Sequence, residues 1–134
     1  MKSFSAAQIL NGLYRPTKAT NAWVAAPADP APSVTLTWEA PQKISRVVVD
    51  FDPDWDHPME SVIKWHHERA MPFTVRHFQI GTPDGKVLKE VEGNFQARWD
   101  LTLPEPVLTV GLTLRILGMN GACPAAVFGV GVYA

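Results

Sequence analysis

The stretch that decides the fold is Phe95-Gln-Ala-Arg-Trp-Asp-Leu-Thr-Leu103, followed after Pro104-Glu-Pro106 by Leu108-Thr-Val-Gly-Leu-Thr-Leu-Arg-Ile116. In both runs large apolar residues alternate with polar or small ones. Successive side chains of a β-strand point to opposite faces, so this period of two predicts strands with one buried and one solvated face. The residues predicted to face the core are Phe95, Ala97, Trp99, Leu101 and Leu103 in the first run, and Leu108, Val110, Leu112, Leu114 and Ile116 in the second.

The same alternation recurs in both directions from this stretch, at residues 34–38, 46–51 and 126–132, with Val48 as the one exception, and residues 87–91 are a further expected strand. Residues 73–80 are also β-rich, but their phase slips near His77, which predicts a bulge. Pro83-Asp-Gly85 has the composition of a tight turn. Ala6 to Leu10 fits a short helical turn or a loop. About seven or eight short strands separated by turns predict one all-β domain over residues 1–134, an antiparallel jelly-roll β-sandwich.

Composition excludes several classes of partner. The chain has 134 residues, of which 46% are hydrophobic and 19% charged, as in a globular domain. Its formal net charge of −1 provides no basic surface for nucleic acid. No apolar run is long enough for a membrane helix. The single cysteine, Cys123, allows no internal disulfide, and the cellular compartment stays open.

One segment, from Asp52 to Pro72, has no strand period. A connection of this length inside a small domain is uncommon and is often functional. The segment is also the part of the chain richest in acidic, imidazole and indole groups. We therefore expect it either to bind a ligand or to pack on another domain.

The order of several short motifs resembles the discoidin or coagulation factor type C family, part of the galactose-binding-domain-like superfamily. The matching pieces are Leu10-Asn-Gly12, Arg15, Asn21-Ala-Trp23, Val34 to Trp38, Ile44 to Phe51, Phe73 to Ile80, Asp84-Gly85, Val91 to Asn94, Leu112 to Ile116 and Ala126 to Tyr133. A closer resemblance is to the C-terminal domain of bacterial FAD-dependent oxidoreductase-like proteins. It is carried by Asn11-Gly12, Arg15-Pro16, Asn21 to Trp23, Phe51-Asp52, His57 to Ser61, Met71 to Phe73 and Gly93-Asn94.

This second resemblance implies that any flavin chemistry belongs to an upstream domain. The chain has no Gly-x-Gly-x-x-Gly motif after a first strand, so it lacks the usual cradle for a dinucleotide. No cofactor is therefore expected in this chain. A structural calcium ion is the exception, because discoidin-like folds often hold one.

Ligand-binding residues are predicted from the loops. Trp23, Trp55 and Trp65 lie in or beside predicted loops, where an exposed indole offers a flat apolar face to a sugar ring. Alternatively, these indoles pin the loops to the sandwich or pack on a neighbouring domain. The polar groups predicted to orient a ligand are Arg15, Asn21, His57, His66, Asn94 and Arg98.

Two groups of residues, one of aspartates and one of histidines, could in principle bind a metal ion. Asp52, Asp54 and Asp56 recur at every second position and could supply calcium ligands, although proline-flanked aspartates also form solvated turns. His57 and Ile63 stand where the helix–loop–helix calcium pattern needs glycine and glutamate. A zinc or iron site is disfavoured because the histidines of this region, His57, His66 and His67, form no chelating pair in sequence.

Two functions follow from these observations. The first is a non-catalytic accessory domain of a larger bacterial FAD-dependent oxidoreductase-like protein, with the upstream flavin domain as its partner. The alternative is a carbohydrate-binding module that uses loop aromatics at one end of the sandwich. An enzyme acting alone is not expected, since no nucleophile–base pair or metal chelate can be named.

Overall fold

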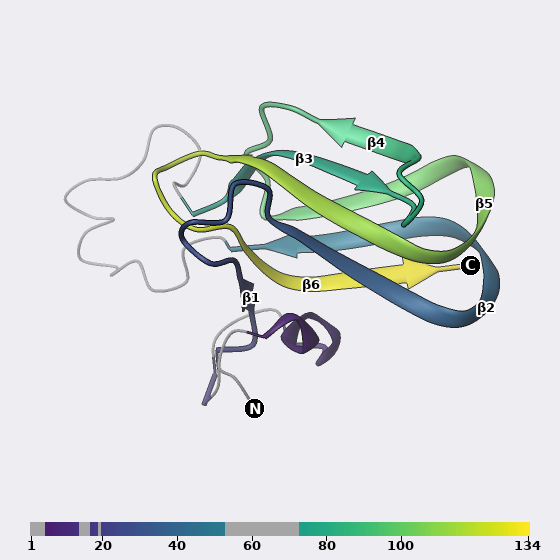
Figure 1. Ribbon diagram of the computed structural model, residues 1–134, viewed down its shortest axis with the longest axis horizontal. Coiled ribbons are helices and arrows are strands. Elements are labelled where there is room, and N and C mark those ends of the chain that lie inside the picture. The colour runs from purple at the N-terminus through teal and green to yellow at the C-terminus, as the bar shows by residue number, and fades with distance from the viewer. Residues whose placement is uncertain (1–4, 14–16, 19, 53–72) are drawn as a thin grey trace.

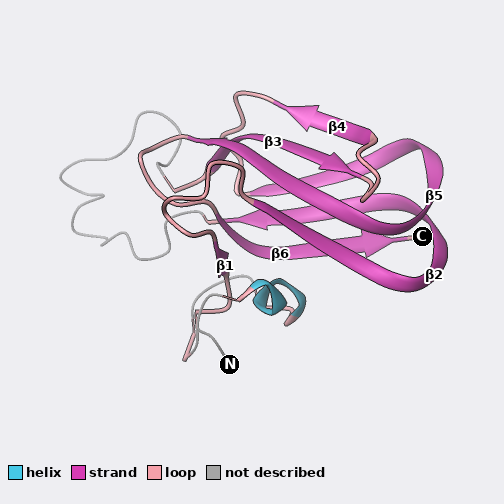
Figure 2. Cartoon of the chain, viewed as in Figure 1, coloured by secondary structure: helices cyan, strands magenta, loops and turns pink. Residues whose placement is uncertain are grey.

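The computed structural model describes residues 5–13, 17–18, 20–52 and 73–134, and the structural statements below concern these residues. They form a short 3-10 helix, η1 (Ala6–Leu10), and a six-stranded antiparallel sheet in the order β1-β6-β2-β5-β3-β4 (Figures 1 and 2). The strands are β1 (Trp23–Val24), β2 (Ser33–Phe51), β3 (Val75–Gly81), β4 (Val87–Val91), β5 (Arg98–Met119) and β6 (Ala126–Tyr133).

The sheet makes two layers because β2 and β5 are long and bend together at one end of the molecule (Figure 1). Residues 46–51 of β2 pair with β6 on one side, and residues 46–50 pair with residues 98–102 of β5 on the other. Residues 33–37 of β2 pair instead with residues 111–115 of β5, and β5 continues to β3 and then β4. One layer therefore contains β1, β6, residues 46–51 of β2 and residues 98–102 of β5. The other contains residues 33–37 of β2, residues 111–115 of β5, β3 and β4.

Prolines explain the bend without ending the strands. Pro41 lies in β2, and Pro104 and Pro106 lie in β5, where each removes a backbone donor from the ladder. The β2–β5 register shifts between Thr37 and Gln42 and again between Ile44 and Arg46. The sequence predicted separate strands on either side of these prolines. When the two halves of β2 and of β5 are counted separately, the described residues contain eight strand segments, in agreement with that prediction.

The core lies between the layers. Phe51 of one layer and Phe78 of the other meet edge to face, with ring centroids 4.9 Å apart. The Trp99 ring lies 5.9 Å from Phe78 in a similar arrangement. Many residues predicted to face inward are buried here, including Leu103, Leu112, Leu114 and Ile116.

The predicted face is wrong at three positions. Phe95 is 69% exposed and precedes β5, while Leu108 and Val110 are exposed and Thr109 between them is buried. The phase of the alternation changes within the bend, before Leu112, so a single inward face cannot run from 108 to 116.

The local predictions for the β3–β4 hairpin are confirmed. The Gly85 amide donates to the Thr82 carbonyl at 3.0 Å, and Gly85 has φ of +99°, a value that glycine adopts without strain. The β3–β5 register shifts on both sides of His77, which is the bulge expected from the sequence. Ala6–Leu10 is helical. Among the described residues, no helix has the length and apolarity needed to span a membrane.

Candidate functional site

The loop between β4 and β5, which contains Asn94, lies at the end of the sandwich opposite the bend, and we call this end the loop end (Figure 1). Asn94 is 5% exposed overall, and its side-chain amide nitrogen donates to the carbonyl oxygens of Val75 at 2.7 Å and Gln96 at 3.0 Å. Its side-chain oxygen accepts from the Gln96 amide, and its backbone amide donates to the Arg76 carbonyl at 2.8 Å. The β4–β5 loop is therefore fixed to β3 by side-chain and main-chain bonds together.

A second asparagine extends this network. The Asn120 side chain donates to the carbonyl oxygens of Thr74 at 2.9 Å and Asn94 at 3.1 Å. The Thr74 hydroxyl in turn donates to the Asp52 carbonyl at 2.8 Å. Four chain segments, at residues 52, 74, 94 and 120, are thus joined by hydrogen bonds at the loop end.

Two phenylalanines are exposed beside these fixed positions. Phe95 follows Asn94, and Phe73 precedes Thr74 and is also exposed. Burial of an exposed aromatic ring against a ligand or partner is favourable by roughly 25 cal/mol for each Å² of apolar surface removed from water. The loop end therefore offers apolar surface on a preorganised support.

Arg98 adds a charged group near this surface, at the first residue of β5. Its side chain is 60% exposed, and its Nε lies 3.9 Å from Oδ1 of Asp50. Burial raises the pKa of the Asp50 carboxyl, and the Arg98 charge partly offsets that rise. The backbone amide of Phe51 donates to the Ala97 carbonyl at 2.6 Å, which ties the start of β5 to the end of β2.

The other predicted ligand residues are placed differently. Trp23 lies in β1 and is only 9% exposed, so the expectation of an exposed indole there is wrong; its ring belongs to the core. Asn21 is buried, accepts a bond from Asn11 at 3.0 Å and donates to Thr17 at 2.9 Å, so its amide serves the fold. The Asn94 side chain likewise binds backbone groups of the protein, at Val75 and Gln96. Arg15, Trp55, His57, Trp65 and His66 lie outside the described residues.

Of the three predicted calcium ligands, one lies in the described part of the chain. Asp52 is described and half-buried, with its carbonyl bound by Thr74, while Asp54 and Asp56 lie outside the described residues. A structural calcium ion at this segment stays a prediction.

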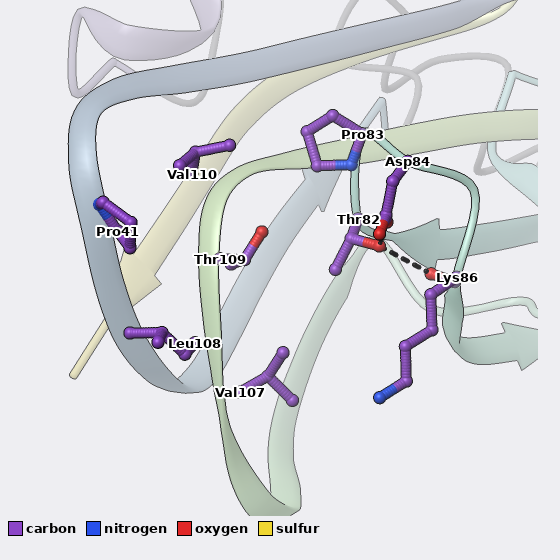
Figure 3. Close-up of a pocket in the computed structure, with 9 residues that line it drawn as sticks. All are labelled: Pro41, Thr82, Pro83, Asp84, Lys86, Val107, Leu108, Thr109 and Val110. Atoms are coloured by element: carbon purple, nitrogen blue, oxygen red, sulfur yellow. Dashed lines mark hydrogen bonds between the residues drawn. The ribbon is translucent and has the colours of Figure 1, made fainter.

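The opposite end of the sandwich contains a pocket of about 590 Å³ (Figure 3). Apolar atoms of Pro41, Pro83, Leu108 and Val110 line much of it. Its polar groups belong to the β3–β4 turn, where the Thr82 hydroxyl donates to the Asp84 carboxylate and also lies 3.4 Å from the Lys86 carbonyl oxygen. The Thr82 bond holds the pKa of Asp84 below its usual value. Among the described residues that line the pocket none is aromatic. The Thr82 and Asp84 side chains are used in closing the turn, and the Thr109 hydroxyl donates to the Gly111 carbonyl at 2.8 Å.

A groove of about 280 Å³ on the other side of the bend does contain aromatic rings, from Trp38 and Tyr133. The Trp38 indole N–H, however, donates to the Thr109 carbonyl at 2.7 Å. The Arg46 guanidinium covers the Tyr133 ring, 5.2 Å from its centroid. The Trp38 N–H and one face of the Tyr133 ring are thus engaged within the protein, whereas Phe95 at the loop end is 69% exposed, so we take the loop end as the candidate site.

Comparison with known proteins places the architecture. No family model matches the chain, and neither does any curated protein sequence. Among solved structures, the chain is similar to a family 32 carbohydrate-binding module of Streptococcus pneumoniae EndoD, with a TM-score of 0.74 and 20% identity over 99% of this chain and 87% of that one. The chain therefore shares the all-β sandwich fold of this module.

Two further structures share this sandwich. One is the family 32 module of C. perfringens NanJ in complex with galactose, with a TM-score of 0.67 and 13% identity over 100% of this chain and 88% of that one. The other is chitosan-binding module 2 from the chitosanase/glucanase of Paenibacillus sp. IK-5 in complex with chitotriose, with a TM-score of 0.70 and 12% identity over 100% and 89%. The all-β fold class expected from the sequence is confirmed.

Sequence reasoning missed Phe95 and Asn120. Phe95 continued the alternation of β5 and was therefore assigned to the core. One signal could have separated it: Gly93-Asn94, which precedes it, is a turn-forming pair, and Gly93 has φ of +66°. Nothing local distinguishes Asn120, whose partners lie 46 and 26 residues away in the chain.

Proposed function

We propose that the chain is a non-catalytic carbohydrate-binding module whose ligand contacts Phe95 at the loop end. The observation that carries the proposal is the exposure of this ring on a loop that Asn94 fixes to β3. The sandwich shared with carbohydrate-binding modules supports it. A fold alone does not determine function, so the proposal depends on the site.

The chemistry of the site suits a sugar. One face of a pyranose ring presents C–H groups that pack on an aromatic ring, while its hydroxyls need hydrogen-bonding groups at the edge. The exposed Arg98 guanidinium can donate such bonds, since its distance of 3.9 Å from Asp50 leaves it outside hydrogen-bond range of that carboxylate. Arg15, Trp55, His57, Trp65 and His66 stay predicted contributors to the same ligand.

The accessory role in a flavoprotein receives less support. None of the solved structures named above is described as an oxidoreductase domain. The exposed Phe73 and Phe95 would also suit packing against a partner domain, because a patch of this kind is costly to leave in water. The upstream flavin domain is therefore the alternative occupant, and the test must distinguish it from a sugar.

The test compares Phe95→Ala with Leu108→Ala. Both side chains are exposed, but Leu108, at 64%, lies at the bend. Galactose and chitotriose, the ligands of two similar modules, are titrated separately into each protein and binding is followed by calorimetry and NMR. We expect weak binding that Phe95→Ala lowers at least tenfold and Leu108→Ala leaves unchanged, with melting temperatures close to that of the parent chain.

Two outcomes would contradict the proposal. Equal loss in both variants would show that Phe95 does not contact the sugar. Absence of binding across a broad glycan array, together with measurable association with a flavin domain supplied in trans, would favour the accessory role instead.

A further inference from the structure

Three side chains with metal-binding atoms converge on the hairpin of β3 and β4, two residues before Asn94, and none of them is among the predicted ligand residues of the loop end. His77 Nε2 lies 2.7 Å from Oε1 of Glu90 and 3.7 Å from Oε1 of Glu92. One ligand atom from each residue lies within 4.8 Å of the other two. His77 is half-buried and both glutamates are exposed.

Backbone register brings these residues together. Phe78 pairs with Val91 and Gln79 with Glu90, which brings Glu90 of β4, and Glu92 just after it, beside His77. On the other side of β3, the bulge at His77 sets it opposite Gly118 of β5. The His77 imidazole is hydrogen-bonded to Glu90 at 2.7 Å, and this bond holds the pKa of Glu90 below its usual value.

We propose that His77, Glu90 and Glu92 bind a divalent transition-metal ion, with Zn²⁺ as the representative. Imidazole nitrogen and carboxylate oxygen are both zinc ligands, and a site with three protein ligands leaves the fourth position open to water. Tetrahedral bonds of about 2.0–2.1 Å place neighbouring ligand atoms about 3.3 Å apart. The two separations from His77, 2.7 and 3.7 Å, lie on either side of that value, and all three ligand atoms lie within 4.8 Å of one another, so side-chain rotations of about an ångström would bring them to the ion.

The charge of the cluster also favours a cation. Two carboxylates face one imidazole, and among the described residues no lysine or arginine lies within ion-pair distance of Glu90 or Glu92. Oxygen and imidazole ligands together suit Zn²⁺ better than Ca²⁺ or Mg²⁺, which bind mainly oxygen.

The experiment uses the whole chain, treated with a chelator and then titrated with Zn²⁺, Ca²⁺ and Mg²⁺ by calorimetry. We expect one Zn²⁺ per cluster with submillimolar affinity, and little heat from the other two ions. His77→Ala and Glu90→Gln should each weaken this binding at least tenfold. Glu105→Gln, at an exposed glutamate in the β5 bend, is the matched control and should leave it unchanged.

A second measurement, made on the parent chain, distinguishes binding at His77 from zinc binding elsewhere and does not depend on the folding of the variants. In the parent chain, the imidazole NMR signals of His77 should shift or broaden on addition of Zn²⁺. If His77→Ala binds Zn²⁺ as tightly as the parent chain, or if the His77 signals stay in place at saturating Zn²⁺, the proposal is wrong and the cluster is a surface ion pair.

Discussion

The amide nitrogen of the Asn94 side chain lies 2.7 Å from the carbonyl oxygen of Val75, so a loop residue is bound to the backbone of β3 in a buried position. A polar residue in a loop is therefore part of the interior. Removing it would leave backbone groups in the interior without partners, which costs more than the loss of a bond exposed to water.

Asn94→Ala should accordingly lower the free energy of unfolding by about 2–4 kcal/mol, since the bonds to Val75 and Gln96 are lost together. Chemical denaturation measures this value. Gln96→Ala is the control, because the bonds at Gln96 use its backbone and its side chain is exposed. Losses of equal size in the two variants would contradict the role assigned to Asn94.

Phe78→Ala should be among the most damaging core changes. Phe78 is fully buried and its ring meets both Phe51 and Trp99, so the variant should lose about 3–5 kcal/mol. Trp99→Ala should cost less, because Trp99 is only partly buried. Denaturation of both variants by urea tests this order, and the reverse order would show that the contact between layers is centred on Trp99.

Two glycines of β5 should differ in their tolerance of a methyl group. A Cβ at Gly111 would lie 2.5 Å from the Leu36 carbonyl oxygen, a backbone atom held in the ladder. A Cβ at Gly118 would lie 2.8 Å from the end of the flexible Arg76 side chain, which can move aside. Gly111→Ala should cost about 1–3 kcal/mol and Gly118→Ala much less. If thermal melts show similar losses of stability in the two variants, the β2–β5 backbone must shift to make room for the methyl group at residue 111.

The stability contributed by Asp50 should depend on pH. Burial raises its folded pKa above the unfolded value of about 3.9, so its contribution is complete below that value and is lost as pH rises through the folded pKa. Asp50→Asn should then raise the melting temperature near neutral pH and have no such effect in acid.

Asp100→Asn should change the melting temperature near neutral pH in the opposite direction to Asp50→Asn. The Arg46 guanidinium donates to both Asp100 oxygens and holds the pKa of Asp100 below its usual value. The stability from this pair is present above the unfolded pKa and is lost as pH falls through the folded one. Asp100→Asn should therefore lower the melting temperature near neutral pH. A scan of both variants in which the two shifts share one sign would refute the assignment.

The sequence predicted those features that depend on neighbours in the chain. Alternation identified the strand segments, Pro83 to Gly85 predicted the turn, and the slip near His77 predicted the bulge. Continuity of β2 and β5 through their prolines was not predictable in this way, because it depends on which strand lies alongside.

The candidate site was predicted only in part. The loop end and Asn94 were identified, but Asn94 was assigned to the ligand, whereas its amide is used to hold backbone groups. The alternation placed Phe95 on the core-facing side of a strand. Alternation shows which side chains share one face of a strand, but it does not show whether another part of the protein covers that face at a given residue, and Phe95 is exposed. His77, Glu90 and Glu92 become neighbours only through the register of β3 with β4, which composition does not reveal.

Because β2 and β5 each contribute to both layers, neither layer can open alone without breaking strands that the other needs. Slow amide hydrogen exchange should therefore be shared by residues 34–36, 47–49, 99–101 and 112–114, and should report one cooperative unfolding unit. The pairing also joins distant parts of the chain: Thr35 bonds Thr113 across 78 residues, and Arg46 bonds Asp100 across 54. Such contacts require large loops to close before they form, so the same two strands that unify the folded molecule should make its folding slow for a chain of this size.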